Sequence, residues 1–112
     1  MEDEQPEIQV PEINAQQLKD MIESAAPPFL LDVREAWEVA RGIIPGAVHI
    51  PMNSIPDRLN ELPTDQPIVV YCAAGGRSYA VAEFMLQQGF SQVTNLAGGI
   101  SAWTQLRPRP AG

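Results

Sequence analysis

Cysteine, histidine and basic residues are scarce in this sequence. Its 112 residues include one cysteine and one histidine, and 7 basic residues stand against 14 acidic ones, for a formal net charge of −7. One cysteine cannot form a disulfide within the chain, and with one histidine it leaves too few ligands for a metal site of the usual kind. Nucleic acids and anionic membranes bind basic surfaces, so this charge balance argues against both as partners.

Long hydrophobic runs are absent as well. No apolar run approaches the roughly 20 residues that a membrane span needs. No basic segment followed by an apolar stretch opens the chain, as it would in a secretory signal. Together with the single cysteine, these features predict a cytoplasmic, reducing location. The length suits one domain, and the 45% of hydrophobic residues can form a small core.

The two ends of the chain differ in composition from its middle. Five acidic residues lie within the first twelve, which is typical of a solvated segment. Near the other end stands Arg107-Pro108-Arg109-Pro110, which cannot continue a helix. We therefore predict a flexible acidic tail at residues 1–6, a folded domain at residues 7–106 and a flexible tail at residues 107–112.

Short apolar segments alternate with amphipathic ones along the domain. Strands are predicted at residues 8–10, 29–33, 47–50, 68–71 and 93–96, and helices at residues 15–24, 36–40, 55–62, 77–88 and 98–106. Asn14 and Gln17 have the spacing of a capping box at the start of the first helix. The helix at 77–88 is expected to bury Ala80, Val81, Phe84 and Met85. The alternation predicts an α/β domain with a mostly parallel central sheet of about five short strands, flanked by helices on both faces.

The single cysteine, Cys72, stands between the strand at 68–71 and the helix at 77–88, at the sheet edge where α/β domains bind ligands. The small residues that follow it allow the backbone to curl, so that successive N–H groups point inward and hold an anion. The start of the helix adds a partial positive charge. We therefore expect a reactive thiol with a lowered pKa, at the mouth of a ring of amides. The alternative is a buried, inert cysteine.

Four motifs occur in a fixed order between about residues 12 and 106. They are Leu31-Asp32-Val33-Arg34-Glu35, the segment from Gly42 to Pro51, the loop Cys72-Ala73-Ala74-Gly75-Gly76-Arg77-Ser78, and Gly98-Gly99-Ile100-Ser101-Ala102-Trp103. In order and spacing they resemble the Leu-Asp-Val-Arg, Gly-His-Ile-Pro-Gly-Ala, Cys-x-x-Gly-x-Arg-Ser and Gly-Gly-x-x-x-Trp segments of the rhodanese family. Ile43 replaces the histidine of the second segment, and we interpret it as a packing residue.

The resemblance implies a single rhodanese-like domain that transfers sulfur in two displacements. A sulfane-sulfur donor such as thiosulfate would form a persulfide on the cysteine, and cyanide, a thiol or a protein thiol would accept the outer sulfur. No metal or organic cofactor would be required. The implied site consists of Cys72 as the catalytic nucleophile, Ala73, Ala74, Gly75, Gly76 and Arg77 as the substrate-binding loop, and Ser78, Asp32 and Arg34 as loop support. The uncharged residues after the cysteine weaken the case for thiosulfate, because some rhodaneses have basic residues there.

The charged residues near the loop have chemical and structural interpretations. Arg77 either contacts a bound anion or braces the loop by pairing with an acid such as Asp32. Structural pairing is favoured for Asp32 and for Arg34, because sulfur transfer between soft anions needs little proton movement. His49 follows a Pro-Gly turn, and a structural role is favoured over a Cys–His catalytic pair. Ser78 is expected to cap the first turn of the helix, with stabilisation of the persulfide as a second possibility, and Trp37 and Trp103 are expected to be packing residues.

Three other functions fit parts of the pattern. A phosphatase or arsenate reductase also has a thiolate loop, but it characteristically has five residues between cysteine and arginine, whereas four stand here. A non-catalytic binding or regulatory module is a second alternative, although inactive rhodanese-like domains usually lack the cysteine. A persulfide carrier for one protein acceptor is a third, and it would use the same chemistry.

Overall fold

A five-stranded sheet forms the centre of the protein in the computed structural model, which describes residues 8–107. The strands are β1 (Glu12–Ile13), β2 (Phe29–Asp32), β3 (Val48–His49), β4 (Ile68–Tyr71) and β5 (Val93–Leu96), in the spatial order β1-β5-β4-β2-β3. All the pairings between these neighbouring strands are parallel. The predicted α/β class with a sheet of about five short strands is confirmed.

The central strands β2 and β4 are buried on both sides, as their continuous apolar sequences predict. Successive side chains of a strand point to opposite faces of the sheet. Ile68 and Val70 of β4 therefore pack in one core cluster, and Val69 and Tyr71 pack in the other. Cys72 continues the alternation and joins the cluster of Ile68 and Val70. The alternation of side chains along β4 thus places the sulfur on the same face of the sheet as Ile68 and Val70.

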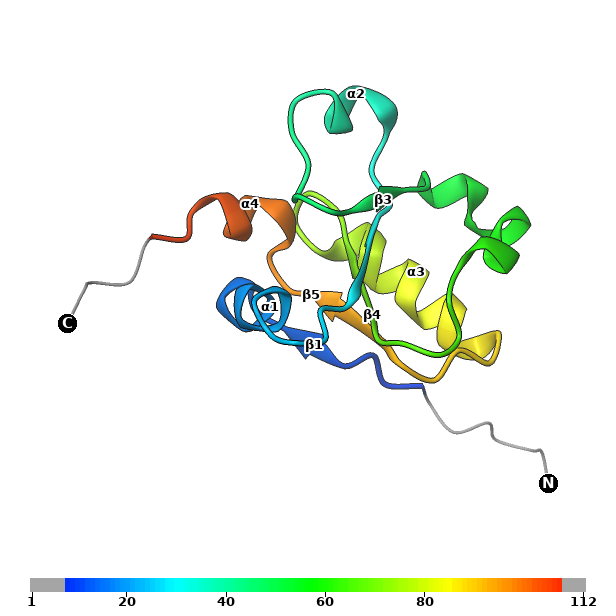
Figure 1. The fold of residues 1–112 in the computed structure, drawn as a ribbon. Coiled ribbons are helices and arrows are strands. Elements are labelled where there is room, and N and C mark those ends of the chain that lie inside the picture. Colours follow the sequence, from blue (N-terminus) through cyan, green and yellow to red (C-terminus); the bar gives the residue numbers. More distant parts are fainter. Residues whose placement is uncertain (1–7, 108–112) are drawn as a thin grey trace.

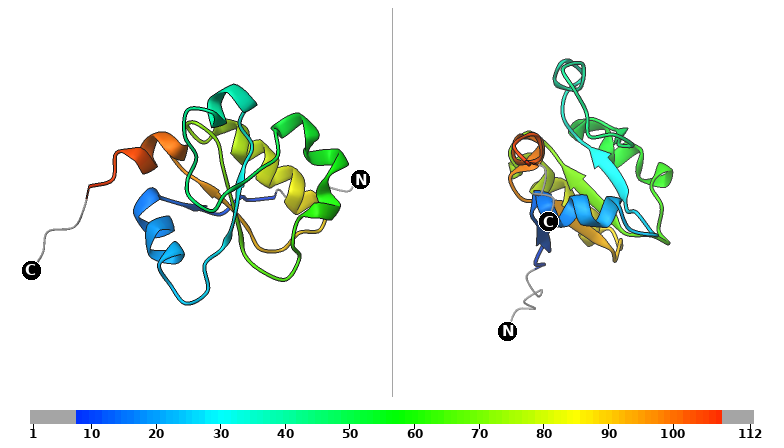
Figure 2. Two further views of the ribbon diagram at one scale, coloured as in Figure 1. Left: turned by 45° about the horizontal axis from the view of Figure 1, so that its top comes forward. Right: turned by 60° about the vertical axis from the view of Figure 1, so that its left-hand side comes forward.

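Helices cover both faces of the sheet, as predicted (Figure 1, Figure 2). The helix α3 (Gly76–Gln87) and the 3₁₀ helix η1 (Met52–Asp57) contribute side chains to the cluster that contains the cysteine. The helices α1 (Ala15–Ile22) and α4 (Gly99–Thr104) contribute to the other cluster. The short helix α2 (Ala36–Val39) follows β2 and projects at the top of Figure 1. Because α3 follows β4 and α4 follows β5, both helices begin at the carboxyl edge of the sheet.

The first strand and the first helix differ from the prediction in their bounds. The strand predicted at residues 8–10 is wrong, and β1 lies after Pro11 instead of before it. Pro11 has no N–H group to donate, but its carbonyl oxygen accepts a hydrogen bond from the Asn95 amide at 2.8 Å and so leads into the pairing with β5. The capping box of Asn14 and Gln17 is present and begins α1.

The short helix predicted at residues 55–62 is present only as two separate 3₁₀ helices. Two 3₁₀ helices, η1 and η2 (Leu59–Glu61), occupy this part of the chain. Pro56 lies inside η1, where it removes a backbone donor and prevents a regular α-helix from forming. The segment therefore packs as two short turns, and Ile55 is its buried side chain in η1.

Several expected packing residues lie nearer the surface. On α3, Val81 and Met85 are buried as expected, but Ala80 is exposed and Phe84 is half-buried. Ser78 and Ala82 are buried in their place, because positions 78, 81, 82 and 85 form one helix face.

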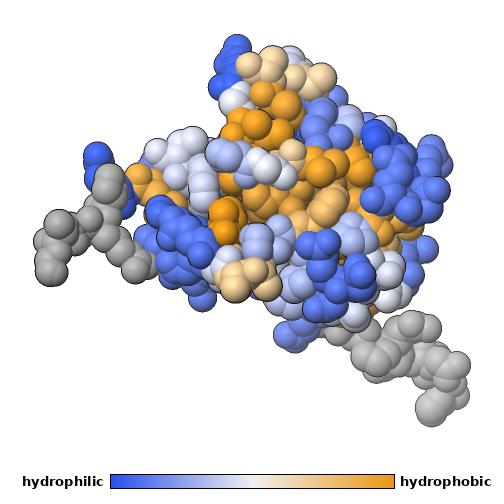
Figure 3. Space-filling model, viewed as in Figure 1, coloured by the Kyte–Doolittle hydropathy of each residue, from blue (hydrophilic) through white to orange (hydrophobic). Residues whose placement is uncertain are grey.

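The region around α2 carries exposed hydrophobic residues. Trp37 is 63% exposed and Ile43 is 38% exposed, so the prediction that both are packing residues is wrong. The guanidinium of Arg41 lies 5.5 Å from the centre of the Trp37 ring. Hydrophobic residues extend from the middle of the face seen in Figure 3 up into this projecting segment. Trp103 of α4, by contrast, packs against the core as expected.

The predicted tails at residues 1–6 and 107–112 lie outside the described residues, except for Arg107, which is exposed. The domain boundary at residue 7 therefore stays a prediction. Within residues 8–107, no helix has both the length and the apolar sequence to cross a membrane.

A buried ion pair at the end of β2 allows a stability prediction. Both Asp32 and Arg34 are buried, and Arg34 Nη2 lies 2.7 Å from Asp32 Oδ2. The substitution Asp32→Ala leaves the guanidinium without its carboxylate, so we expect the free energy of unfolding to fall by about 3 kcal/mol in urea denaturation. As a control, Arg58→Ala breaks the exposed pair with Glu61 and should change it little. Equal effects of the two substitutions would contradict this account.

Candidate active site

Three hydrogen-bond donors converge on the sulfur of Cys72, the first residue after β4. The Gly75 amide lies 3.1 Å from Sγ, the Ser78 amide 3.4 Å and the Ser78 hydroxyl 3.3 Å. The two amides belong to the turn that leads into α3, where the first N–H groups of a helix lack acceptors within the helix. The loop therefore surrounds the sulfur with partial positive charge.

The environment of Cys72 favours its thiolate form. Burial by itself raises the pKa of the Cys72 thiol, but hydrogen bonds from the Ser78 hydroxyl and from the amides of Ser78, Gly75 and Ala74 outweigh it and hold this pKa below its usual value. The direction of this pKa shift agrees with the expectation from the sequence. The position of the sulfur does not agree, because Cys72 is only 1% exposed, whereas we expected it at the mouth of the amide ring.

The start of α4 holds the outer side of the loop. The amides of Ile100 and Ser101 donate to the carbonyl oxygens of Cys72 and Ala73, at 2.9 and 3.1 Å. In a trans peptide the N–H group points away from the carbonyl, so these contacts turn the amides of Ala73 and Ala74 away from α4. A Cβ atom on Gly99 would lie 2.5 Å from both carbonyl oxygens, so glycine is required at this position.

Gly75, whose backbone lies in the left-handed region, closes the loop at the start of α3. Gly75 has φ +111°, a conformation that residues with a side chain rarely adopt, and it is the N-cap of α3. A Cβ atom on Gly75 would also lie 3.3 Å from the amide nitrogen of Gly98. Two glycines from distant motifs thus allow two backbone segments to approach each other beside the cysteine.

The arginine of the loop is paired, but its partner is not the predicted one. Arg77 Nη1 and Nη2 donate to the two carboxylate oxygens of Glu38, at 2.7 and 2.9 Å. The expected pairing of Arg77 with an acid is therefore present, but the acid is Glu38 and not Asp32, because Arg34 occupies both oxygens of the Asp32 carboxylate. The hydrogen bond from Arg77, with help from the Glu35 amide, lowers the pKa of the Glu38 carboxyl to about 2. The pair joins α2 to the start of α3.

Asp32 and Arg34 support the segment around α2 and not the cysteine loop itself. Beyond its carboxylate partner, Arg34 donates to the carbonyl oxygens of Glu38 and Gly42, at 3.4 and 2.7 Å. His49 Nε2 lies 2.6 Å from the Arg34 carbonyl oxygen. Within residues 8–107, no hydrogen bond or ion pair joins these three side chains to Cys72. One link to the loop runs through Glu38 and Arg77, and a second runs through Tyr71, the residue before Cys72, because the Arg34 guanidinium lies 5.7 Å from the centre of the Tyr71 ring.

Comparisons with known proteins agree with this fold and loop. The family model described as the rhodanese-like domain matches residues 14–106. The chain belongs to the rhodanese-like domain family. A protein of Allochromatium vinosum named a sulfurtransferase is 41% identical over 96 residues, which cover 86% of this chain and 90% of that protein. The family membership expected from the four motifs is confirmed.

Solved structures of rhodanese-like domains resemble this one closely. A rhodanese-like domain protein from Staphylococcus aureus is 36% identical, with a TM-score of 0.80, and the match covers 84% of this chain and 91% of that chain. A human single-domain sulfurtransferase is 23% identical, also with a TM-score of 0.80, over 89% of this chain and 100% of that chain. The second likeness concerns the fold alone.

In this rhodanese-like domain, a buried polar chain that the sequence analysis missed leads to the cysteine. The Ser78 hydroxyl lies 2.6 Å from Asn95 Oδ1, and Asn95 Nδ2 donates to Glu12 Oε2 at 2.7 Å and to the Gly75 carbonyl oxygen at 3.2 Å. Asn95 is fully buried in β5. An asparagine within the apolar strand at 93–96 was a usable signal, because a buried amide needs hydrogen-bond partners.

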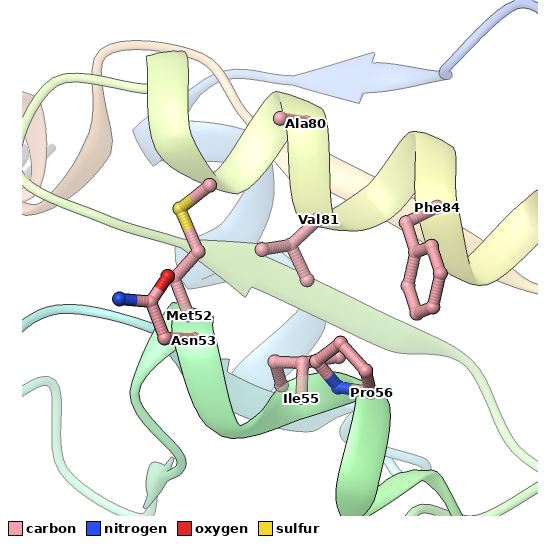
Figure 4. A pocket seen from close by; sticks show the side chains of 7 residues that line it. All are labelled: Met52, Asn53, Ile55, Pro56, Ala80, Val81 and Phe84. Carbon is pink, nitrogen blue, oxygen red and sulfur yellow. The ribbon is translucent and has the colours of Figure 1, made fainter.

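A separate pocket of about 240 Å³ lies between η1 and α3 (Figure 4). Its lining consists of Met52, Asn53, Ile55 and Pro56 on one side and Ala80, Val81 and Phe84 on the other. Cys72 is not among these residues, so the pocket gives no access to the sulfur. Within residues 8–107, no group of three or more histidine, cysteine, aspartate or glutamate side chains is placed to hold a metal ion.

The donors around the sulfur predict how the thiol titrates. The substitution Ser78→Ala removes one donor to Sγ, so the pKa of Cys72 should rise and its alkylation by a haloacetamide at neutral pH should slow about tenfold. Because Cys72 is the only cysteine, the ultraviolet absorbance of the thiolate reports it alone. Ser91→Ala, at an exposed serine, is the matched control. An unchanged titration in Ser78→Ala would show that the hydroxyl does not stabilise the thiolate.

The Arg77–Glu38 pair predicts a pH-dependent stability. The pKa of Glu38 is about 2 in the folded protein, below its ordinary value of 4.5, so the pair stabilises the fold above that value and loses its effect as the pH falls towards 2. Glu38→Gln should therefore lower the melting temperature near neutral pH, and the difference from wild type should shrink below about pH 4.5. Glu61→Gln, in an exposed pair, should show a smaller difference. A difference that stays constant down to pH 2 would refute the assignment.

Proposed function

We propose that this rhodanese-like domain is a sulfurtransferase that carries a sulfane sulfur as a persulfide on Cys72. The observation that carries the proposal is the convergence of the Gly75 amide, the Ser78 amide and the Ser78 hydroxyl on one sulfur atom. These donors stabilise a sulfur anion, and the thiolate is the form that attacks another sulfur. The Allochromatium vinosum relative that bears the name sulfurtransferase supports the same reaction class.

In the first displacement, the Cys72 thiolate attacks the outer sulfur of a donor such as thiosulfate. A sulfur–sulfur bond forms to Sγ, the donor's own sulfur–sulfur bond breaks, and sulfite leaves with the electron pair. In the second displacement, cyanide or a thiolate attacks the outer sulfur, and Sγ leaves with the electron pair as a thiolate again. Thiocyanate or a new persulfide is released. Neither step needs a redox or proton-transferring cofactor, and covalent catalysis divides one transfer into two.

The backbone of the loop would hold the persulfide. Its outer sulfur would lie about 2 Å beyond Sγ, one sulfur–sulfur bond away. The amides of Gly76 and Arg77 begin α3, where N–H groups have no acceptor within the helix, and they are available to a sulfur anion. The amides of Ala73 and Ala74, turned away from α4, complete the binding loop of residues 73 to 77. Ser78 supports both forms by its contact with Sγ.

The charges near the loop bear on the choice of donor. Arg77 is the cation of the loop, and its guanidinium is engaged by the Glu38 carboxylate. Ala73 and Ala74 add no charge. A dianion such as thiosulfate therefore meets little net positive potential here, and we propose that the physiological donor carries less negative charge, as a persulfide does. The acceptor would be a thiol, and a thiol of a protein partner would make the domain part of a sulfur relay.

The geometry disfavours a phosphatase or an arsenate reductase. An oxyanion with four oxygens needs the loop arginine to bind it, but both terminal nitrogens of Arg77 bind Glu38. The loop has four residues between Cys72 and Arg77, one fewer than those enzymes characteristically have. A non-catalytic module is disfavoured by the donors around Sγ, which an inert cysteine would not need.

The test is intact-mass analysis of the protein after addition of a sulfane-sulfur donor. We expect Cys72 to gain the mass of one sulfur atom and to lose it again when cyanide is added. Thiosulfate and a small-molecule persulfide should be compared as donors, and the persulfide should load the protein faster. Cys72→Ser is the matched control and should gain nothing.

Two results would contradict the proposal. A wild-type protein that takes up no sulfur from any sulfane donor would leave the non-catalytic module as the better account. Rapid hydrolysis of an aryl phosphate that Cys72→Ser abolishes would favour the phosphatase.

A further inference from the structure

A continuous chain of hydrogen bonds connects the first strand of the sheet to the reactive sulfur. It runs from the Glu12 carboxylate in β1 to the Asn95 amide in β5, then to the Ser78 hydroxyl in α3 and to Cys72 Sγ. We propose that Asn95 is a positioning residue for sulfur transfer, which holds the Ser78 hydroxyl and the Gly75 carbonyl in place and is itself oriented by Glu12. The effect of Asn95 on sulfur transfer rests on the function proposed above, whereas its effect on the pKa and the alkylation rate of the Cys72 thiol does not.

The partners of Asn95 fix the orientation of its amide. Nδ2 lies 2.7 Å from a carboxylate oxygen of Glu12 and 3.2 Å from the Gly75 carbonyl oxygen, and both of these atoms can only accept. Oδ1 therefore faces the Ser78 hydroxyl at 2.6 Å and accepts from it whenever that hydroxyl does not give its single proton to Cys72 Sγ. Among the described residues, every buried side-chain nitrogen and oxygen has a partner, so the chain is complete.

The orientation of Asn95 determines where the Ser78 hydroxyl lies. The hydroxyl has one proton and two acceptors, Asn95 Oδ1 at 2.6 Å and Cys72 Sγ at 3.3 Å. The contact with Asn95 fixes the rotamer of Ser78, so that the same hydroxyl stays within reach of the sulfur. When the sulfur is anionic, a charge-assisted bond draws the proton towards it. Without Asn95, the hydroxyl is free to rotate away.

The second contact of Asn95 acts on the backbone of the loop. Its Nδ2 group holds the carbonyl of Gly75, the residue whose own amide donates to Sγ at 3.1 Å. Gly75 has no side chain to restrict its backbone, and its carbonyl oxygen accepts both from the Tyr79 amide of α3 at 3.2 Å and from Asn95 Nδ2, which adds a hold from β5 to that of the helix. Asn95 therefore supports two of the three donors to the sulfur from a single buried position.

Charged groups near Cys72 also affect its pKa, so a measured change in that pKa must be assigned either to a charge or to the position of Asn95. From α3, Arg77 faces the sulfur side of the loop, and its own pKa is raised chiefly by Glu38 of α2 and to a lesser extent by Cys72. From β1, Glu12 lies at the far end of the chain. The Asp32–Arg34 pair after β2 is internally neutralised. Removing the negative charge of Glu12 would by itself lower the pKa of Cys72, whereas losing the position of Asn95 would raise it.

Because the charge of Glu12 and the position of Asn95 change the pKa of Cys72 in opposite directions, two Glu12 variants can separate the two effects. Glu12→Ala removes the acceptor for Nδ2, and we expect the alkylation of Cys72 at neutral pH to slow about threefold, with a titration shifted to higher pH. Glu12→Gln keeps an acceptor oxygen, so it should restore most of the wild-type profile. Glu12 is exposed, so both variants should fold. Glu23→Ala, at an exposed acidic residue in the turn after α1, controls for the loss of a surface charge.

The role of Ser78 as intermediary is tested by a double-mutant cycle. Asn95→Ala should slow alkylation about tenfold in the wild-type background but only about threefold in the Ser78→Ala background, because the remaining effect passes through Gly75. Persulfide formation from a sulfane donor should fall in parallel.

Two results would overturn the proposal. One is equal acceleration of alkylation by Glu12→Ala and Glu12→Gln, which would show that only the charge of Glu12 acts. The other is an effect of Asn95→Ala that is the same with and without Ser78. If wild type forms no persulfide while these alkylation results hold, the proposed function fails and the positioning of the thiol by Asn95 stands.

Discussion

Hydrogen bonds to one buried sulfur are the interaction on which this structure depends. Cys72 is 1% exposed, so its thiolate form would have almost no contact with water and the protein must supply the stabilisation that water would give. Two amides and a hydroxyl do so, within 3.4 Å of Sγ. Each donor must stay aligned, because a hydrogen bond weakens steeply with distance and angle. Much of the surrounding structure can be understood as maintaining that alignment.

Three separate parts of the fold hold the loop. The first turn of α4 holds the carbonyls of Cys72 and Ala73 on the outer side. Asn95 of β5 holds the Gly75 carbonyl and the Ser78 hydroxyl on the inner side. The carboxylate of Glu38 holds the guanidinium that follows the loop. All three attachments come from segments that meet at the carboxyl edge of the parallel sheet, where connections are free to carry function.

The sequence was sufficient for the elements that have strong local signals. The apolar strand before Cys72, the capping box at Asn14 and the four motifs predicted the fold class, the family and the reactive loop. It was insufficient where local patterns compete with tertiary packing. Pro56 lies in a segment that was predicted as one short helix and forms 3₁₀ turns, and Trp37, expected to be a packing residue, lies exposed on a projecting segment. The polar chain through Asn95 joins residues 83 positions apart, and no local pattern encodes such a contact.

The sequence by itself determined the candidate nucleophile, the glycines that let the backbone curl around it and the parallel α/β architecture, because these follow from residue type and near-neighbour spacing. Only the tertiary structure decided that Cys72 is buried, that Arg77 pairs with Glu38 and not with Asp32, and that Asn95 reaches Ser78. Such contacts depend on strand order and on which face of each element is covered. Those properties arise when distant segments pack together, so the order of residues along the chain does not display them.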